Sequence, residues 1–312
     1  MATTTISTTN KATEKAKGID VSHWQGIVDF EKVAAAGYTF VMLNAGYGKY
    51  AKQKDESFER NYQAAKKAGL KIGAYWYSYA LTEADALAEA KTFLEAVKGK
   101  SFEYPLAFDI EDASQNELPR EAIDKMITAF CTHLEKNGYY AALYSYADFL
   151  SRKVSDKVKN RFDIWVAHFD VAKPSAESYG IWQYTSKATV NGVNGRCDCN
   201  YAYKDYPSII RAGGLNNLSA SDTSKPDNST NVAKVLDKSG CKKGDKNSTV
   251  LALKYLLMIA KNKGLHNVSL DKNNIFGEGT EKAVNALLKK WGYKQNGIAG
   301  SKFIDKLGKT LI

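Results

Sequence analysis

Two acidic residues, Asp109 and Glu111, have the spacing that catalysis by a pair of carboxyl groups requires. They lie in the segment YPLAFDIED. On a β-strand, residues two apart project from the same face, so the two carboxyls are predicted to lie side by side, with Leu106, Phe108 and Ile110 on the other face. Burial and repulsion raise the pKa of one carboxyl, which then stays protonated as a general acid beside an ionised neighbour, as glycosidic bond cleavage needs. Two solvated acids at a strand end are the alternative.

Two further aspartates are expected at the same end of the molecule. Asp20 ends the first predicted strand, in GIDVSHWQG, and Asp198 lies near the last predicted strand, in CDCN. The first and last strands of a closed barrel are neighbours, so four carboxyls would gather at one mouth. Such a cluster is costly unless a substrate or shared protons relieve the repulsion, and it therefore indicates a functional site.

Aromatic residues on the predicted strands can provide flat platforms for sugar rings, although a place in the core is the alternative for each of them. The candidates for substrate binding are Tyr75, Tyr77, Tyr144, Trp165 and Trp182. His23 and His168 are left out of the predicted site, because neither has an evident Ser or Cys nucleophile beside it and a hydrogen-bonding role suffices.

Short apolar segments that alternate with helical patterns predict the frame for these residues. Strands are expected around residues 18–21, 40–43, 72–75, 106–110, 141–144, 164–166, 181–183 and 198, and helices at 30–36, 58–68, 84–97 and 120–137. This alternation predicts an α/β fold in which a parallel sheet closes into a TIM-like (β/α) barrel, with working groups at the C-terminal strand ends. The last strands are only about 17 residues apart, which is too close for full-length helices, so we expect an irregular barrel.

A polar segment and a change in charge divide the chain. Residues 216–231, NNLSASDTSKPDNSTN, cannot bury a core. We therefore predict a disordered tail at 1–17, a barrel at 18–213, a linker at 214–236 and a small domain at 237–312. The whole net charge of +10 comes from residues 225–312, where 17 lysines stand against seven acidic residues.

This basic C-terminal part favours an anionic partner. Nucleic acid is not expected, because the part has no arginine to read guanine edges and few aromatics to stack on bases. An anionic polymer such as a bacterial wall fits at least as well.

Other features of the sequence bound the function. No apolar run approaches the length of a membrane span, so membrane insertion is not expected. The first 17 residues lack the apolar block of a secretory signal. The cysteines have no metal-ligand spacing, and neither a disulfide framework nor a cofactor is expected. Cys197 and Cys199 flank Asp198, so their thiols are predicted to face the core.

The ordered set of motifs resembles the glycoside hydrolase family 25 lysozymes over residues 18–212. The matching segments are GIDVSHWQG, GAYWYSYA, DIE, WQYT and DCN. The resemblance implies an irregular (β/α) barrel that cleaves the β-1,4 bond between N-acetylmuramic acid and N-acetylglucosamine in peptidoglycan. It implies that Glu111 is the proton donor and that Asp109 orients or stabilises the reacting sugar, with Asp20 and Asp198 completing an acidic floor. Asn44 departs from the family, whose members often carry Lys or Arg there.

The C-terminal part resembles the three-helix peptidoglycan-binding domain. Helices are predicted at 248–262, 280–291 and 301–307, and the resemblance is carried by the segments IFGEGTEKAV and NGIAG. Lys254 stands where Gln is common and Asn274 where Gly is common. The alternative is a small helical bundle whose lysines only keep it soluble.

Together these features predict an enzyme, a muramidase with a wall-targeting module. We expect a phage or prophage endolysin that is made in the host cytoplasm, released at lysis and active outside the cell on a Gram-positive-type wall. The alternatives are a catalytically silent wall-binding protein, an autolysin or bacteriocin-type muramidase, and another glycosidase such as a chitinase. Whether the substrate acetamido group or a water molecule attacks the sugar stays open.

Overall fold

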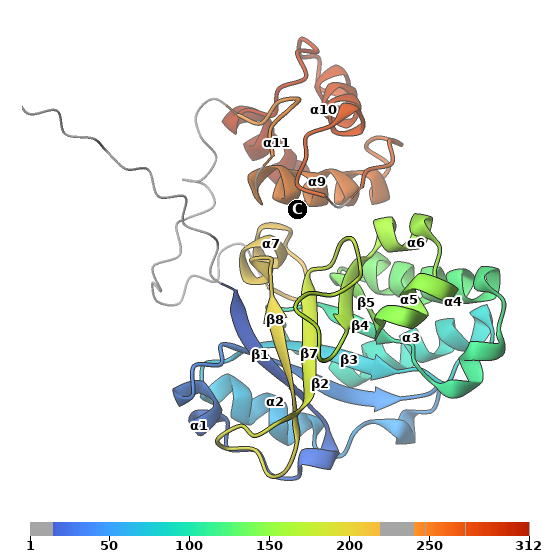
Figure 1. The fold of residues 1–312 in the computed structure, drawn as a ribbon. Helices are drawn as coiled ribbons and strands as arrows, with labels where there is room; N and C mark the ends of the chain where they lie inside the picture. The colour runs from blue at the N-terminus through green and yellow to red at the C-terminus, as the bar shows by residue number, and fades with distance from the viewer. Residues whose placement is uncertain (1–14, 219–239, 247, 272, 312) are drawn as a thin grey trace, which may run out of the picture.

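A closed barrel of eight strands forms the larger part of the chain in the computed structural model, which describes residues 15–218, 240–246, 248–271 and 273–311 (Figure 1). The strands follow one another around the barrel in chain order: β1 (Ala16–Val21), β2 (Phe40–Tyr47), β3 (Lys71–Tyr77), β4 (Leu106–Asp109), β5 (Ala141–Tyr146), β6 (Asp163–Ala167), β7 (Ile181–Ala188) and β8 (Cys197–Ala202). All eight predicted strands are present, so the sequence prediction of a barrel is confirmed.

The last strand departs from the predicted parallel sheet. Neighbouring strands from β1 to β7 run parallel, whereas β8 is antiparallel to both β7 and β1. No helix separates β6 from β7 or β7 from β8 in this described part of the chain. The connection from β7 to β8 is too short for a crossover, so it returns the chain antiparallel to β7, whereas the longer connection from β6 to β7 allows a parallel strand without a helix. The predicted irregularity at the end of the barrel is therefore confirmed, and it reverses the direction of one strand.

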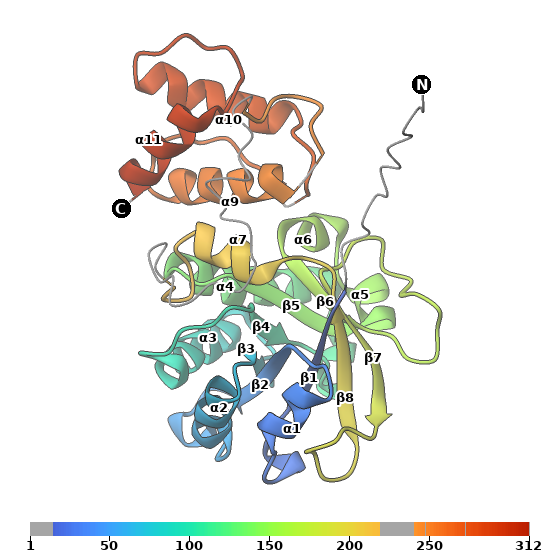
Figure 2. The ribbon, with the colours of Figure 1, turned by 90° about the vertical axis from the view of Figure 1, so that its left-hand side faces the viewer.

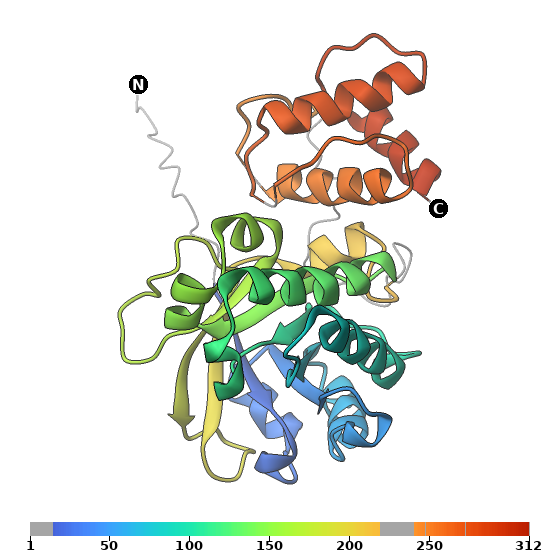
Figure 3. The ribbon, with the colours of Figure 1, turned by 90° about the vertical axis from the view of Figure 1, so that its right-hand side faces the viewer.

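Helices surround the rest of the barrel. Four helices occupy the predicted positions: α1 (Phe30–Ala35), α2 (Phe58–Lys67), α3 (Glu83–Val97) and α4 (Arg120–Lys136). Further short helices follow β5 and β8, namely α5 (Ala147–Lys153), α6 (Asp156–Arg161) and α7 (Tyr206–Ala212), and 3-10 turns lie at His23–Gln25, Ala51–Gln53 and Ala113–Glu117. Figure 2 shows β7 and β8 on the side away from α2, α3 and α4, and Figure 3 shows these three helices covering the opposite side.

The two faces of β4 show how the strand pattern positions the acids. Leu106, Phe108 and Ile110 are buried in the layer between the sheet and the helices, where the Phe108 ring stacks on Phe130 at a centroid distance of 4.1 Å. Because side chains alternate along a strand, Asp109 points into the barrel. The predicted assignment of the two faces of this strand is confirmed. Cys197 and Cys199 lie in the same outer layer, as predicted, and all four cysteines are buried and form no disulfide in the described part of the chain.

The C-terminal unit contains the helices α9 (Ser248–Asn262), α10 (Glu278–Lys290) and α11 (Ser301–Leu311) around a core of its own. Helix α10 begins two residues before the predicted start and α11 extends four residues beyond the predicted end. Lys254, singled out in the sequence, is only 1% exposed and donates to Asp271 and to the Asn273 Oδ1 atom (2.8 Å). A buried ammonium needs such partners.

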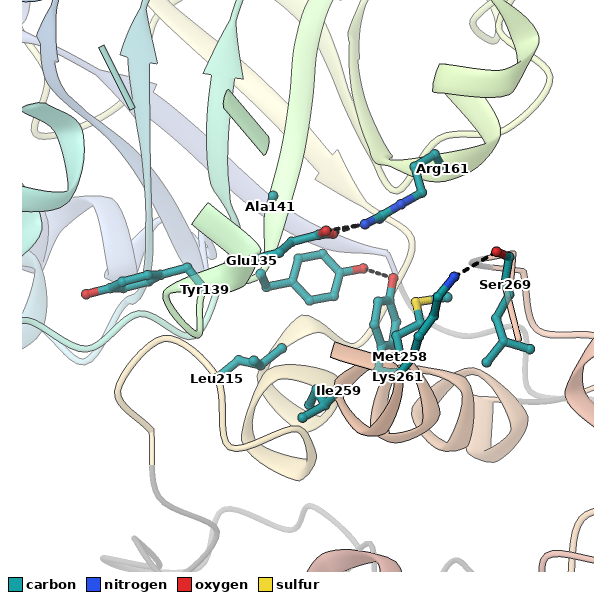
Figure 4. Close-up of a pocket in the computed structure, with 12 residues that line it drawn as sticks. Glu135, Tyr139, Ala141, Arg161, Leu215, Met258, Ile259, Lys261 and Ser269 are labelled. Atoms are coloured by element: carbon teal, nitrogen blue, oxygen red, sulfur yellow. Dashed lines mark hydrogen bonds and ion pairs between the residues drawn. The ribbon is translucent and has the colours of Figure 1, made fainter. Parts of the chain in front are cut away.

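Helix α9 packs against the end of the barrel where the parallel strands begin. Tyr255 and Leu251 are buried together with residues of α7 and the barrel, and the Tyr255 hydroxyl is hydrogen-bonded to that of Tyr140. The Tyr140 hydroxyl in turn donates to the buried carboxylate of Asp163, 2.7 Å away. Figure 4 shows the small pocket of about 150 Å³ beside this contact, closed on one side by the ion pair between Arg161 and Glu135.

Folded structure extends beyond the predicted barrel limits at both ends. Strand β1 begins at Ala16, which pairs with Ala202. Asn216 is completely buried, because its side chain accepts the Tyr140 N–H at 2.7 Å and donates to the Tyr104 carbonyl at 2.9 Å. Residues 214–218 of the predicted linker therefore belong to the barrel, and the remainder up to residue 236, like residues 1–14 of the predicted tail, lies outside the described residues. No helix in the described ranges has the length and apolar character to cross a bilayer.

Candidate active site

The four predicted acids meet in one cleft of about 600 Å³, at the end of the barrel opposite to the α9 contact. Asp20 is next to last in β1 and lies directly opposite Asp198 of β8 in the strand register. Asp109 is the last residue of β4 and pairs with Tyr144 of β5. Glu111 follows two residues later. Because β8 runs antiparallel, Asp198 reaches the mouth from near the start of its strand.

The backbone beyond β4 is held so that Glu111 stays beside Asp109. The Ile110 N–H donates to the Tyr144 carbonyl at 3.1 Å, and the Ser145 hydroxyl donates to the Ile110 carbonyl at 2.5 Å. These bonds continue the β4–β5 pairing for one residue past the strand. The alternation of side chains therefore persists, and both carboxyls face the cleft.

Glu111 has the properties of a general acid. Burial raises its pKa to about 7 and the charge of Asp198 adds to that rise, while the neighbouring hydroxyl groups of Tyr144 and Tyr146 oppose it. One carboxyl oxygen, Oε2, is buried without a hydrogen-bond partner among the described residues. A carboxyl with this pKa is mostly protonated at mildly acidic pH and can still release its proton near neutrality.

Asp109 lies deeper than Glu111. It is 3% exposed, and its Oδ1 atom has no hydrogen-bond partner in the described part of the chain. Burial raises its pKa well above the ordinary value, and the charges of Glu111 and then Asp20 raise it further. A buried oxygen without a hydrogen-bond partner costs free energy of folding. A bound substrate that donates a hydrogen bond to Oδ1 would remove this cost.

Asp20 is the most strongly hydrogen-bonded of the four acids. Its carboxylate accepts the side-chain amides of Asn200 at 2.7 Å and Gln183 at 3.0 Å. Burial and then the charge of Asp198 raise its pKa, while these two amides oppose the rise. Burial also raises the pKa of Asp198, to about 6. The two aspartates thus share one acidic floor, as predicted.

Gln183 and Asn200 connect this floor to the aromatic residues below it. Gln183 accepts the Tyr144 hydroxyl at 2.9 Å, and Asn200 accepts the Trp165 indole N–H at 2.8 Å. Neither amide was predicted as a site residue. The position of Asn200 could have been predicted from the sequence, because it is two residues after Asp198 and therefore shares the same face of β8.

Four of the five predicted aromatics line the cleft: Tyr75, Tyr77, Tyr144 and Trp165. Trp165 is only 1% exposed and Tyr144 6%, so these two support the floor and offer no open platform.

Trp182 was wrongly predicted to bind substrate. It precedes Gln183 on β7, and since Gln183 points into the barrel, Trp182 must point outward. Its ring lies in the outer core, and its indole donates to the His168 carbonyl at 2.8 Å.

Five further aromatics that were not predicted as site residues also line the cleft. They lie at the last residue of a strand or just beyond it: Trp24, Tyr47, Tyr79, Tyr146 and Phe169. Trp24 is 83% exposed and Tyr79 is 51% exposed. Two of them could have been predicted from the sequence, because Tyr79 and Tyr146 each lie two residues after a selected tyrosine, Tyr77 and Tyr144.

His23 and Asn44 also line the cleft. The Nδ1 atom of His23 lies 2.8 Å from the buried Asp55 carboxylate. Away from the cleft, His168 accepts the Ser175 N–H at 3.2 Å through its Nδ1 atom. Both histidines thus have the hydrogen-bonding role expected of them. No group of three or more His, Cys, Asp or Glu side chains in the described ranges is arranged to hold a metal ion.

A closed (β/α) barrel with a protonatable glutamic acid among buried aspartates defines the class of carboxyl-dependent glycosidases. The comparison with known families is more specific. The family described as Glycosyl hydrolases family 25 matches residues 19–193, more than half of the chain, and the chain belongs to this family.

Individual relatives agree with that assignment. The chain is 31% identical over 199 residues to the autolytic lysozyme of Clostridium acetobutylicum, and the match covers 64% of this chain and 58% of that protein. A crystal structure of the bacterial lysozyme from Streptomyces coelicolor is similar at a TM-score of 0.55 and 27% identity, covering 66% of this chain and 100% of that one. The catalytic domain of an endolysin from a bacteriophage of Listeria monocytogenes is similar at a TM-score of 0.54 and 25% identity, covering 64% and 98%.

Proposed function

We propose that this chain hydrolyses the β-1,4 bond between N-acetylmuramic acid and N-acetylglucosamine in bacterial peptidoglycan. The observation that carries the proposal is the pKa of Glu111, raised to about 7 by burial, on a carboxyl beside Asp109 in a cleft large enough for several sugar rings. Membership of a lysozyme-containing family supports the same reaction.

In this proposal Glu111 gives its proton to the glycosidic oxygen as the bond to the anomeric carbon breaks. The unpaired Oδ1 of Asp109 accepts the N–H of the 2-acetamido group and turns the acetamido oxygen toward that carbon. The oxygen attacks, and water opens the resulting ring while Glu111 takes a proton from the water. This substrate-assisted route is favoured over direct attack by water, because it gives the unpaired oxygen of Asp109 a partner.

The accessible aromatics extend the proposed substrate site beyond one sugar. Trp24, Tyr79 and Phe169 lie on the connections after β1, β3 and β6, and Tyr146 is the last residue of β5. Platforms from separate connections around the mouth suit a polymer that crosses the cleft, with sugar faces stacked on the rings.

The C-terminal unit is proposed to keep the enzyme on the wall. Its lysine excess supports binding to anionic wall polymers and to the peptidoglycan of a Gram-positive-type wall. Retention on the wall raises the local substrate concentration without changing the chemical step. The protein would therefore act at the cell wall, outside the cytoplasm.

We further propose that the enzyme serves as a phage or prophage endolysin. The similarity to an endolysin catalytic domain supports this setting. An autolysin is the second candidate, favoured by the similarity to an autolytic lysozyme. Deleting the gene from its native genome separates the two, since an endolysin mutant fails to release phage and an autolysin mutant fails to divide or autolyse normally.

Turbidity loss of a Gram-positive wall suspension tests the reaction. The parent is expected to clear walls, and Glu111→Gln is expected to clear them far more slowly while sedimenting with them equally well. Sedimentation of Glu111→Gln at rising salt, with and without the anionic polymers extracted, tests the role of the C-terminal unit. Equal clearance of the walls by Glu111→Gln would refute the role of Glu111. Sedimentation that changes neither with rising salt nor with extraction of the anionic polymers would refute the electrostatic role of the lysines.

A further inference from the structure

The turn that follows β3 presents two aromatic rings to the cleft. Tyr77 ends the strand, and Tyr79 lies two residues later with its ring 5.1 Å from the Tyr77 ring and 5.9 Å from the Tyr47 ring. Beyond the strand, the Ser78 N–H still donates to the Asp109 carbonyl at 2.9 Å. The position of this turn therefore determines where two sugar platforms stand relative to the acids.

A buried carboxyl of α3 holds this turn from behind. Glu89 is 1% exposed, and its Oε1 atom accepts the Tyr79 N–H at 2.9 Å. Its other oxygen, Oε2, is buried without a hydrogen-bond partner among the described residues. Burial raises the pKa of Glu89 to about 7, opposed by the Ser78 hydroxyl and the Tyr79 N–H.

The charged groups around Glu89 do not neutralise it. Asp85, on the same helix, raises its pKa, and Lys49, after β2, lowers it. These two residues form an ion pair with each other at 2.6 Å. Glu89 is therefore mostly a neutral acid below neutral pH, and ionisation forces a charge into a buried position.

A second buried side chain holds the turn from the other side. The Gln115 amide donates to the carbonyls of Ser78 and Ala80, each at 3.1 Å, and its oxygen accepts the Asp112 N–H at 3.0 Å. The Asp112 carboxylate in turn accepts the Tyr77 hydroxyl at 3.3 Å. The turn is thus held between α3 and the segment that follows Glu111.

We propose that Glu89 is a positioning residue, which acts through the Tyr79 backbone to hold Tyr77 and Tyr79 where a glycan chain stacks. Glu89 touches neither substrate nor the four acids of the cleft. The proposal rests on the proposed function and adds a residue to it. An apolar residue can fill the volume of the Glu89 side chain but leaves the Tyr79 N–H without its acceptor, whereas a side chain with an acceptor oxygen holds the turn.

Binding of the N-acetylglucosamine tetramer to the full chain carrying Glu111→Gln tests this role without turnover. Adding Glu89→Leu is expected to weaken binding by about tenfold, the effect of one lost hydrogen bond on a platform-bearing turn. Adding Glu89→Gln, which keeps the acceptor, is expected to restore most of the affinity. With Glu111 intact, Glu89→Leu is expected to raise KM more than it lowers kcat.

Val97→Ala is the matched control, because Val97 is a buried residue of the same helix. It is expected to lower Tm and to leave tetramer affinity unchanged. A pH series adds a readout that needs no substrate. The Tm of Glu89→Gln is expected to rise relative to the parent between pH 5 and pH 8, as the parent acquires its buried charge.

The inference is overturned if Glu89→Leu binds the tetramer as tightly as its Glu111→Gln parent, or if Val97→Ala weakens binding as much. It is also overturned if Glu89→Gln fails to restore binding. Should the Glu111→Gln protein with Glu89 intact not bind the tetramer at all, the proposed function falls together with this inference. If that protein binds the tetramer and adding Glu89→Leu does not change the affinity, the inference is wrong but the proposed function stands.

Discussion

At the scale of single residues, burial and crowding set the protonation of the cleft. Glu111, Asp198, Asp20 and Asp109 all have raised pKa values, and burial is the first cause for each. One group, Glu111, has a pKa of about 7 together with a buried unpaired oxygen at the cleft. This combination supports the proposal that Glu111 is the proton donor, whereas the Asp20 carboxylate already accepts hydrogen bonds from two amides.

Replacing Glu111 with Gln should remove catalysis and stabilise the fold. General acid catalysis contributes about 10² to 10⁴ in rate, so kcat should fall by that factor. The folded pKa of about 7 exceeds the ordinary value of 4.5, so stability of the parent is full below about pH 4.5 and is lost as pH rises through 7. The mutant should therefore be more stable than the parent by ~1–3 kcal/mol at pH 8, and equal to it near pH 4.

Urea unfolding of both proteins at pH 4 and pH 8 checks the stability part of this prediction. A gain that is the same at both values would mean that Glu111 is not buried as a neutral acid. The activity of the parent should also decline as pH rises above about 7, because the donor loses its proton.

Replacing Asp109 with Asn separates the two routes of attack. In the substrate-assisted route the amide still fits the cleft but cannot accept the acetamido N–H equally well, so kcat should fall by about 10² or more with little change in KM. Steady-state kinetics on a soluble glycan checks this, with Asn44→Asp as a cleft variant that leaves all four acids in place. Full activity of Asp109→Asn would show that the acetamido group needs no carboxylate partner.

At the scale of elements, the sequence determined which segments form strands and helices, and it determined part of the site. The alternation along β4 placed Asp109 correctly because Phe108 and Ile110 are unmistakably apolar. On β7 the neighbouring residues Trp182 and Gln183 must face opposite sides of the sheet. The polar Gln183 faces the barrel interior, where it donates to Asp20, and the aromatic Trp182 packs in the outer core. The aromatic type of Trp182 does not show which face of the strand it occupies. The hydrogen bond from Gln183 to Asp20 does show it, because it places Gln183 on the inner face and Trp182 on the outer one.

The reversal of β8 was beyond sequence reasoning for another reason. Spacing showed that no helix fits before β8, but either strand direction buries the apolar side chains Cys197 and Cys199 on the same face. Strand direction depends on hydrogen bonding to β1 and β7, which are distant in sequence or joined by an irregular loop. Trp24, Tyr79 and Phe169 were missed because they lie beyond the strands, where the two-residue alternation is not guaranteed.

Close packing between β1 and β2 gives a prediction for the barrel frame. A Cβ on Gly18 would lie 2.3 Å from the buried Phe40 ring. Gly18→Ala should therefore destabilise the protein by ~1–3 kcal/mol through overpacking, while kcat at low temperature stays near that of the parent. Thermal unfolding and steady-state kinetics check this. Gly26→Ala is the comparison variant. At Gly26 a Cβ would meet no atom within 4 Å, but φ is +62°, so this substitution tests backbone strain without crowding.

At the scale of the whole molecule, the cleft and the C-terminal unit lie at opposite ends of the barrel. Helix α9 meets the barrel through Tyr255, which is buried against Tyr140 and close to the carboxylate of Asp163. Asp163 also accepts the Tyr206 hydroxyl at 3.0 Å and pairs with Lys204 at 2.7 Å. A satisfied buried network of this kind joins the two units more specifically than apolar contact alone.

Removing the Tyr255 ring should uncouple the two units. Tyr255→Ala loses an aromatic contact and a buried hydrogen bond, which together stabilise by ~3–5 kcal/mol at most. The parent should unfold in one calorimetric transition, and the mutant in two. Tyr293→Ala, an exposed tyrosine of the same unit, is the control. A single unchanged transition in Tyr255→Ala would show that the contact contributes no coupling.

The reducing-end sugar of fragments released from purified walls tests the central claim most directly. Mass spectrometry of borohydride-reduced fragments should find reduced N-acetylmuramic acid after digestion by the parent, and almost none after equal incubation with Glu111→Gln. Fragments ending in reduced N-acetylglucosamine, or equal release by both proteins, would contradict the account of Glu111 as the acid of a muramidase.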